Sequence, residues 1–110
     1  MKIHLFMNGN DDFIRRIRQN LQMKDGELCL ILAEYVEPET YYEPSDFKGL
    51  TLANIVNNQG KIIIICSHFS RETLMPNVQF KELIAKKNIG FLKIPFSSED
   101  LWKKYLECSR

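Results

Sequence analysis

Four short apolar runs, separated by segments with helical periodicity, constrain the fold of this chain more than any other feature. The clearest run, Lys61–Cys66, holds four consecutive isoleucines, which are β-branched and favour strands. Glu27–Ala33 is apolar at successive positions, which is typical of a strand covered by helices on both faces. Lys2–Met7 and Ile89–Ile94 complete the set. Strands that alternate with helices in this way pair in parallel, through right-handed crossovers.

The segments that separate and follow these runs carry apolar residues at helical spacing. We expect one helix around Ile17 and Leu21, capped at Asn10 or Asp11, and three more at about residues 47–58, 77–87 and 98–106, the last capped at Ser97 or Ser98. Residues 34–48 hold two prolines, three tyrosines and five acidic residues with no clear period, which predicts a long loop. Residues 1–110 are expected to form a single domain.

Composition narrows the classes of function. The net charge is +1, so no strong attraction to nucleic acid or to a membrane surface is expected. The charge is uneven, because residues 1–55 carry nine acidic and six basic side chains and residues 56–110 carry five and nine. Three cysteines without a CxxC motif predict neither a disulfide framework nor a zinc site. No signal peptide or membrane span is recognised, so we expect a cytoplasmic protein without a cofactor.

Ligands and chemistry collect beyond the carboxyl ends of parallel strands. Seven polar residues lie at or just beyond the ends of the predicted strands and form the candidate strand-end pocket: Asn8, Asp11, Asp12, Glu34, Ser67, His68 and Lys93. Asp11 and Asp12 are weak candidates for binding Mg²⁺, with helix capping as the alternative. Glu34 could be a ligand, a general base or simply the first solvated residue. Ser67 and His68 lack the GxSxG motif of a nucleophile elbow, so serine hydrolase chemistry is not expected.

Other side chains suggest contacts rather than chemistry. Tyr35, Tyr41 and Tyr42 could form a partner surface, since tyrosine is favoured at interfaces, or could pack back on the domain. His4 lies in a predicted strand and is expected to be a core or interface residue. Neither GxGxxG nor a P-loop is present, which argues against nucleotide binding by those routes.

Three stretches resemble the receiver domain of two-component response regulators, over roughly residues 27–107. ELCLILAEYVEP resembles the strand that ends in the phosphoacceptor aspartate, with Glu34 at the acceptor position and Pro38 at the proline four residues later. GLTLANIVNNQGKIIIICSH resembles the next helix and strand, which end in the switch serine or threonine, here Ser67. FLKIPFSSEDLWKKYL resembles the last strand and helix, and PFSSEDL is its most specific part.

This chain departs from the receiver pattern at the residues that carry phosphotransfer. Asn8 stands where a metal-binding acid is expected, Glu34 replaces the acceptor aspartate, and Ile94 replaces the lysine, although Lys93 is its neighbour. About 26 residues separate Asn8 from Glu34, too few for the second strand and helix of that family. In that family the missing strand and helix form one edge of the sheet, so the remaining strands could still make a four-stranded sheet. The resemblance therefore implies a degenerate receiver that is not phosphorylated.

TIR-like domains offer a second resemblance. They begin with a strand, a loop carrying an acid and a helix, and they have a long loop after the second strand and a strand ending in serine, as ICSHFS does. Members that hydrolyse NAD place a glutamate in the helix after that strand, and Glu82 in FKEL would be the candidate. The chain is short for that fold and lacks the tryptophan usual near this glutamate.

These observations predict a flavodoxin-like three-layer α/β/α domain with a four-stranded parallel sheet. The expected function is a non-enzymatic signalling or regulatory module without a catalytic residue, which binds a protein partner or a second copy of itself. Its contact surface would be the last strand and helix, with Trp102 and Tyr105, and the acidic tyrosine loop, with Tyr35, Tyr41 and Tyr42. The alternatives are a TIR-like NAD hydrolase or interaction domain that uses Glu82, and a sensor that binds a small molecule, of unknown identity, in the strand-end crevice.

Overall fold

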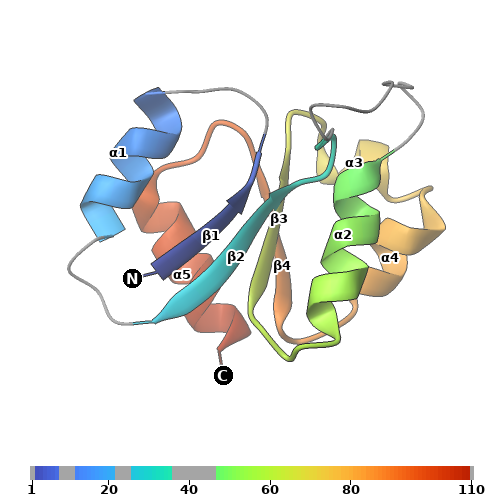
Figure 1. The fold of residues 1–110 in the computed structure, drawn as a ribbon. Coiled ribbons are helices and arrows are strands. Elements are labelled where there is room, and N and C mark those ends of the chain that lie inside the picture. Colours follow the sequence, from blue (N-terminus) through green and yellow to red (C-terminus); the bar gives the residue numbers. More distant parts are fainter. Residues whose placement is uncertain (1, 8–11, 22–25, 36–46, 110) are drawn as a thin grey trace.

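A computed structural model describes residues 2–7, 12–21, 26–35 and 47–109, with only the backbone for some residues of the first helix. The elements within these ranges alternate between strands and helices (Figure 1). In chain order they are β1 (Lys2–Phe6), α1 (Asp12–Leu21), β2 (Glu27–Leu32), α2 (Lys48–Asn57), β3 (Ile63–Ser67), α3 (Arg71–Leu74), α4 (Val78–Ile84), β4 (Ile89–Lys93) and α5 (Ser98–Cys108).

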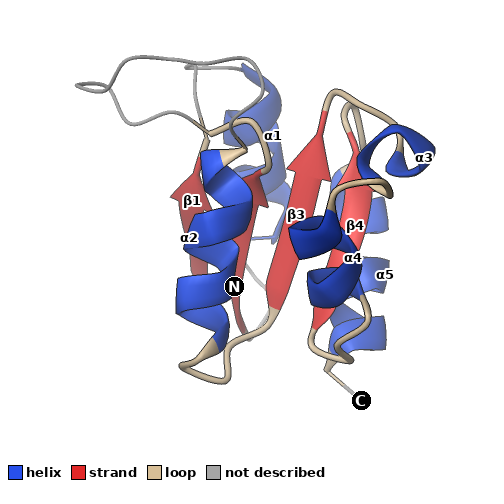
Figure 2. Cartoon of the chain, turned by 90° about the vertical axis from the view of Figure 1, so that its right-hand side faces the viewer, coloured by secondary structure: helices blue, strands red, loops and turns tan. Residues whose placement is uncertain are grey.

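The four strands form one parallel sheet in the order β1-β2-β3-β4 (Figure 2). The sheet is continuous in register, since Cys29 pairs with Ile63 and Ile63 pairs with Ile89. β2 and β3 are the inner strands, and their apolar residues are almost completely buried. The prediction of a four-stranded parallel sheet is confirmed.

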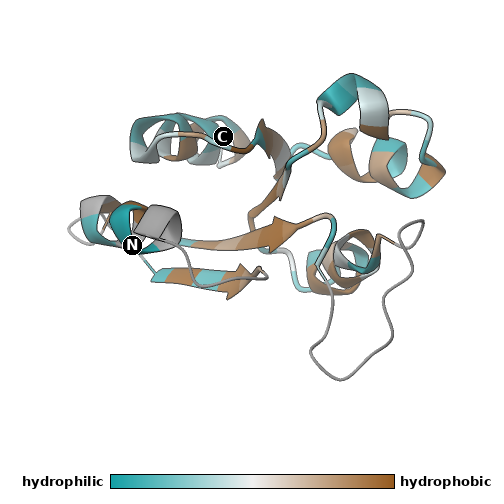
Figure 3. Ribbon diagram, turned by 90° about the horizontal axis from the view of Figure 1, so that it is seen from above, coloured by the Kyte–Doolittle hydropathy of each residue, from teal (hydrophilic) through white to brown (hydrophobic). Residues whose placement is uncertain are grey.

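Two separate hydrophobic cores lie on the two faces of the sheet. Leu28 and Leu30 of β2 belong to the core that Ile17 of α1 and Leu101 of α5 complete. The alternate residues of the same strand belong to the other core, which α2, α3 and α4 cover. This arrangement explains why the β2 run is apolar at every position, because both faces of a strand inside the sheet need apolar side chains. Figure 3 shows the apolar strands as the middle of three layers. The chain is thus a small flavodoxin-like α/β domain.

The position of α1 corrects one expectation. The strands follow one another across the sheet in chain order, so crossovers of a single hand would place every connecting helix on the same face. Instead, α1 lies on the face opposite to α2 and α4. The β2–α2–β3 crossover is right-handed and the β1–α1–β2 crossover is left-handed (Figures 1 and 2). A right-handed first crossover would have left α5 as the one helix over the face that holds Leu28 and Leu30.

Local sequence explains most helix boundaries. The last helix has a capping box, in which Ser97 accepts a hydrogen bond from the Asp100 amide and Asp100 accepts one from the Ser97 amide. The Asn77 side chain caps α4 by accepting from the Phe80 amide. The short helix α3 was not predicted, since four residues are too few to show a helical period. Asn10 and Asp11, the predicted caps of α1, lie outside the described residues.

Gly49 allows the first turn of α2 to lie directly against the end of β2. Its amide donates to the carbonyl of Ala33 at 3.1 Å. A Cβ atom at this position would lie 1.8 Å from the Leu32 carbonyl oxygen, so no larger residue fits without a shift of the backbone. This contact fixes the start of α2 against the end of β2.

Candidate functional site: a bonded carboxylate at the strand ends

Glu34 and Ser67 meet at the carboxyl edge of the sheet, beyond β2 and at the last residue of β3. The Ser67 hydroxyl donates a short hydrogen bond to Oε1 of Glu34. The other carboxylate oxygen, Oε2, accepts a hydrogen bond from the backbone amide of His68 at 3.1 Å. Both oxygens of the Glu34 carboxylate are therefore engaged by the end of β3, as the parallel sheet geometry predicts for neighbouring strand ends.

Backbone hydrogen bonds place these two residues side by side. The amide of Ala33 donates to the carbonyl of Cys66 at 2.8 Å, which continues the β2–β3 ladder past the end of β2. The amide of Tyr35 then donates to the carbonyl of Leu32 at 2.9 Å, which closes a turn around Glu34. The turn holds the Glu34 side chain opposite the end of β3.

Ser67 is a fully buried side chain with complete hydrogen bonding. Its hydroxyl oxygen accepts a hydrogen bond from the Phe69 amide at 2.9 Å while its proton is donated to Glu34. A buried serine whose lone pair already accepts a peptide N–H is poorly placed to attack a substrate. The side chain of the adjacent His68 is exposed. The arrangement thus binds and orients a carboxylate rather than activating a nucleophile.

The Glu34 carboxylate affects the pKa of the neighbouring Cys66 thiol. Burial raises the pKa of Cys66 to about 12, and the nearby Glu34 carboxylate contributes to this rise because it disfavours a second negative charge. The thiol donates a weak hydrogen bond to the Ile31 carbonyl at 3.6 Å. Cys66 is therefore a protonated core residue beneath the site.

Lys93 reaches the same edge of the sheet without pairing with the carboxylate. It stands opposite Ser67 in the β3–β4 register and is exposed. Its ammonium donates to the carbonyl of Ile94 at 3.5 Å. No ion pair joins Lys93 to Glu34, and among the described residues the Ser67 hydroxyl and the His68 amide hold the carboxylate.

Two aromatic pairs flank the site, and of their members only Tyr35 was singled out from the sequence. Tyr35 packs edge-to-face on Phe6, with ring centroids 6.2 Å apart. Phe47, just before α2, makes the same kind of contact with Phe69, at 6.3 Å. Phe69 is 46% exposed, although it is a large apolar residue. Its position two residues after the apolar β3 run was the available signal.

The remaining predicted site residues fall into two groups. Asn8, Asp11, Tyr41 and Tyr42 lie outside the described residues, and of Asp12, the first residue of α1, only the backbone is described. In the part of the chain that the structure describes, no three histidine, cysteine, aspartate or glutamate side chains are grouped to bind a metal ion. The prediction that places Asn8, Asp11 and Asp12 beside Glu34 stays a prediction.

The predicted contact residues of α5 are half-buried. Trp102 and Tyr105 stack with ring centroids 5.4 Å apart and an interplanar angle of 21°. Both pack on the core beneath α5 and keep part of their surface accessible. Glu82, the alternative catalytic residue, is exposed on α4. His4 is partly buried on β1, where its Nε2 lies 2.6 Å from a Glu27 carboxylate oxygen.

Comparisons of the chain with protein-family models, with curated proteins and with solved structures found no significant match. None of the described helices combines the length and the apolar character needed to cross a membrane.

Proposed function

We propose that this chain is a non-enzymatic, receiver-like interaction module in which Glu34 takes the place of a phosphorylated acceptor. The observation that carries the proposal is the hydrogen bond from the Ser67 hydroxyl to the Glu34 carboxylate. These residues occupy the acceptor and switch positions in the receiver resemblance. A glutamate is longer than an aspartate, and its carboxylate reaches the serine without an added phosphoryl group.

The state of the carboxylate supports a role without phosphotransfer. Its two oxygens already accept hydrogen bonds from Ser67 and from the His68 amide. These bonds draw electron density from the carboxylate that would attack a phosphoryl donor, and Lys93 makes no ion pair with Glu34 that could neutralise the incoming charge. Electrostatic stabilisation is the largest contribution to such reactions, so its loss removes most of the rate.

The strand order is compatible with a receiver-like sheet that has lost its edge strand. In a flavodoxin-like sheet of order 2-1-3-4-5, the first helix leads to an edge strand, and the chain then crosses back to the strand on the other side of strand 1. Removal of the second strand and its following helix leaves the order 1-3-4-5. It also leaves the first helix on its original face, which makes the first crossover left-handed. The order β1-β2-β3-β4 and the left-handed β1–α1–β2 unit match this deletion.

As an interaction module, the domain would work through surfaces rather than through a reaction centre. The half-buried Trp102–Tyr105 stack on α5 and the segment that begins at Tyr35 are the contact surfaces in this proposal. Three free cysteines, each buried as a thiol, support placement in a reducing compartment such as the cytoplasm.

The proposal is tested by incubating the protein with acetyl phosphate and Mg²⁺ and measuring its intact mass. A functional receiver domain in the same mixture serves as the positive control for the phosphoryl donor. The expected mass of this protein is unchanged. A gain of one phosphoryl group that is lost in the Glu34→Gln variant would contradict the proposal, because it would identify Glu34 as an acceptor.

A further inference from the structure

The outer edge of β4 presents backbone groups without partners. The amide of Ile63 donates to the Asn88 carbonyl, and the amide of Ile94 donates to the Ser67 carbonyl. In a parallel ladder these bonds turn the even-numbered residues of β4 toward β3. Phe91 and Lys93 therefore direct their N–H and C=O groups away from the sheet, and no described residue pairs with them.

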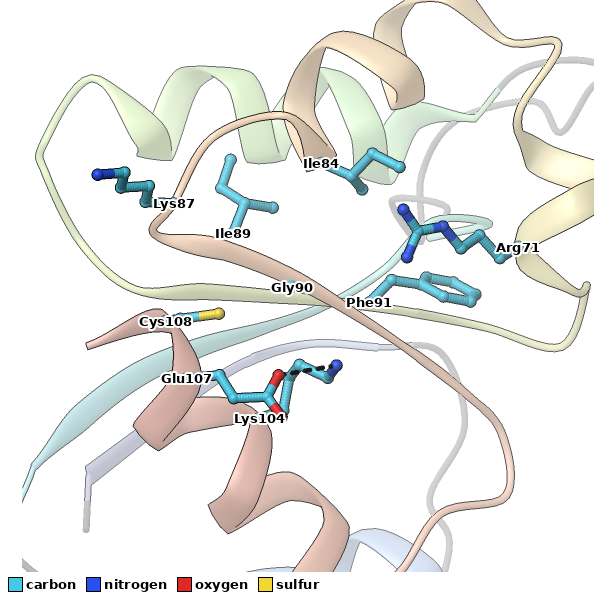
Figure 4. Close-up of a pocket in the computed structure, with 9 residues that line it drawn as sticks. All are labelled: Arg71, Ile84, Lys87, Ile89, Gly90, Phe91, Lys104, Glu107 and Cys108. Atoms are coloured by element: carbon cyan, nitrogen blue, oxygen red, sulfur yellow. Dashed lines mark ion pairs between the residues drawn. The ribbon is translucent and has the colours of Figure 1, made fainter. Parts of the chain in front are cut away.

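A groove runs along this edge between the two helical layers. It has a volume of about 240 Å³ (Figure 4). Ile84 of α4 and the ring of Phe91 form an apolar side, and Phe80 fixes that ring through an edge-to-face contact at 5.4 Å. Gly90 forms the floor on the α5 side. A Cβ at Gly90 would lie 2.7 Å from the Lys104 side chain, so the glycine allows α5 to approach the strand edge.

The walls of the groove are predominantly basic. Arg71, Lys87 and Lys104 line it, and Glu107 is the one acidic lining residue. Glu107 lies 3.2 Å from Lys104, which neutralises one of the three cations. The side chains of Arg71 and Lys87 make no hydrogen bond or ion pair with any described residue, and both residues are exposed. Two unpaired cations thus stand beside a strand edge with free hydrogen-bonding groups.

We infer that this groove binds an extended acidic segment of a partner protein, which adds to the sheet as a strand beside β4. Main-chain hydrogen bonds to Phe91 and Lys93 would supply the pairing, as in other cases where a peptide extends a sheet. Alternate side chains of the segment would point to the two faces. The glutamates of one row would lay their methylene groups over Ile84 and Phe91 and bring their carboxylates to Arg71 and Lys87, and the other row would face the α5 side. The inference rests on the proposed role as an interaction module and adds the chemistry of the partner.

The charges favour an acidic partner over a second copy of this chain. Pairing two β4 edges about a twofold axis would bring together the cations of both copies, including the exposed Lys93 of each. Like charges placed against each other oppose such an interface. The same cations would attract an acidic strand but would repel each other in a symmetric dimer.

The test uses the full ¹⁵N-labelled chain and a short, end-blocked peptide of alternating valine and glutamate. Amide chemical shifts and hydrogen exchange are followed by NMR during the titration. We expect the peptide to slow exchange at the Phe91 and Lys93 amides by about tenfold or more, while Gly90 and Leu92, which already face β3, change little. The matched peptide with lysine in place of glutamate should bind at least about tenfold more weakly.

Protein variants and N-methylated peptides separate the contribution of charge to binding from that of main-chain hydrogen bonding. Lys87→Glu, a change at an exposed position, should weaken binding of the acidic peptide about tenfold, whereas Lys103→Glu, on α5 outside the groove, should change it less than about twofold. N-methylation of alternate peptide residues removes the N–H groups along one edge of the peptide and leaves the protein intact. Methylation of one of the two alternate sets should abolish binding, and methylation of the other should be tolerated.

Three results would overturn the inference: equal binding of the acidic and basic peptides, shifts that map away from β4, or no binding up to about 1 mM peptide. Protection of Phe91 that rises with protein concentration in the absence of peptide would identify a second copy as the occupant and would also overturn it. Different results contradict the proposed function and this inference. A phosphoryl adduct on Glu34 would contradict that function whatever the peptide does, and an unchanged mass without peptide binding would contradict this inference alone.

Discussion

The Ser67 hydroxyl bonds to the Glu34 carboxylate across the carboxyl ends of β3 and β2, and neither side chain is fully exposed. Ser67→Ala would leave one carboxylate oxygen without its donor and the Phe69 amide without its acceptor. Hydrogen bonds to charged groups contribute more than neutral ones, so we expect the free energy of unfolding to fall by about 2 kcal/mol. Urea denaturation measures this change. His68→Ala, which retains the backbone amide that Glu34 accepts, is the matched control and should cost less than about 0.5 kcal/mol.

Gly49 provides a steric test of the contact between α2 and β2. Gly49→Ala would place a methyl group 1.8 Å from the Leu32 carbonyl oxygen, and we expect a loss of about 3 kcal/mol in unfolding free energy. Gly60→Ala is the comparison, because Gly60 has a φ of +71° but nothing within 4 Å of the added atom. Backbone strain alone should cost about 1–2 kcal/mol there. Equal stability of the two variants, measured by thermal or urea unfolding, would refute the close approach.

The thiol of Cys66 should be inert in the folded protein. Burial and the Glu34 charge raise its pKa to about 12, so almost none is thiolate at neutral pH. We expect Cys66 to resist alkylation by iodoacetamide until the protein is unfolded in urea, as measured by mass spectrometry of the labelled peptides. Rapid labelling of Cys66 under native conditions would show that the end of β3 opens readily.

Glu27 should make stability depend on pH in the acidic range. Hydrogen bonds from His4 and then Lys61 lower the pKa of Glu27 below its usual 4.5. A carboxylate with a lowered folded-state pKa stabilises the protein above the unfolded-state pKa, and this contribution is lost as pH falls through the folded-state value. Urea midpoints measured between about pH 6 and pH 3 should therefore fall less steeply in Glu27→Gln than in the wild type. His4→Ala should reduce the slope in the same direction, and an unchanged slope in both variants would contradict the prediction.

Local pattern was enough to predict the sheet and to place Glu34 and Ser67 at its carboxyl edge. The isoleucines of β3 and the unbroken apolar run of β2 indicated buried parallel strands, and parallel strands bring their carboxyl ends together. That Glu34 and Ser67 meet depends also on β2 and β3 being neighbours, which the order of the strands in the sheet decides. The Ser97 cap was predictable because a serine followed three residues later by an acidic side chain satisfies two free amides.

Long-range relationships were not predictable in the same way. The face on which α1 packs depends on the whole set of strand crossovers, and a helical period around Ile17 and Leu21 does not specify it. The β4 groove depends on Arg71, Gly90 and Lys104, which lie in three different elements. Gly90 was the one local signal, since an isolated glycine in a strand often marks a close approach by another part of the chain.

The most direct test of the central claim is the hydrogen-exchange rate of the His68 amide in the wild type and in Glu34→Ala, measured by NMR. His68 is exposed, and its amide donates to Oε2 of Glu34. If the carboxylate is held by the end of β3, the amide exchanges slowly in the wild type and about tenfold or more faster in the variant. Equal rates in the two proteins would show that Glu34 does not occupy the site, and the account of a carboxylate in place of a phosphorylated acceptor would be wrong.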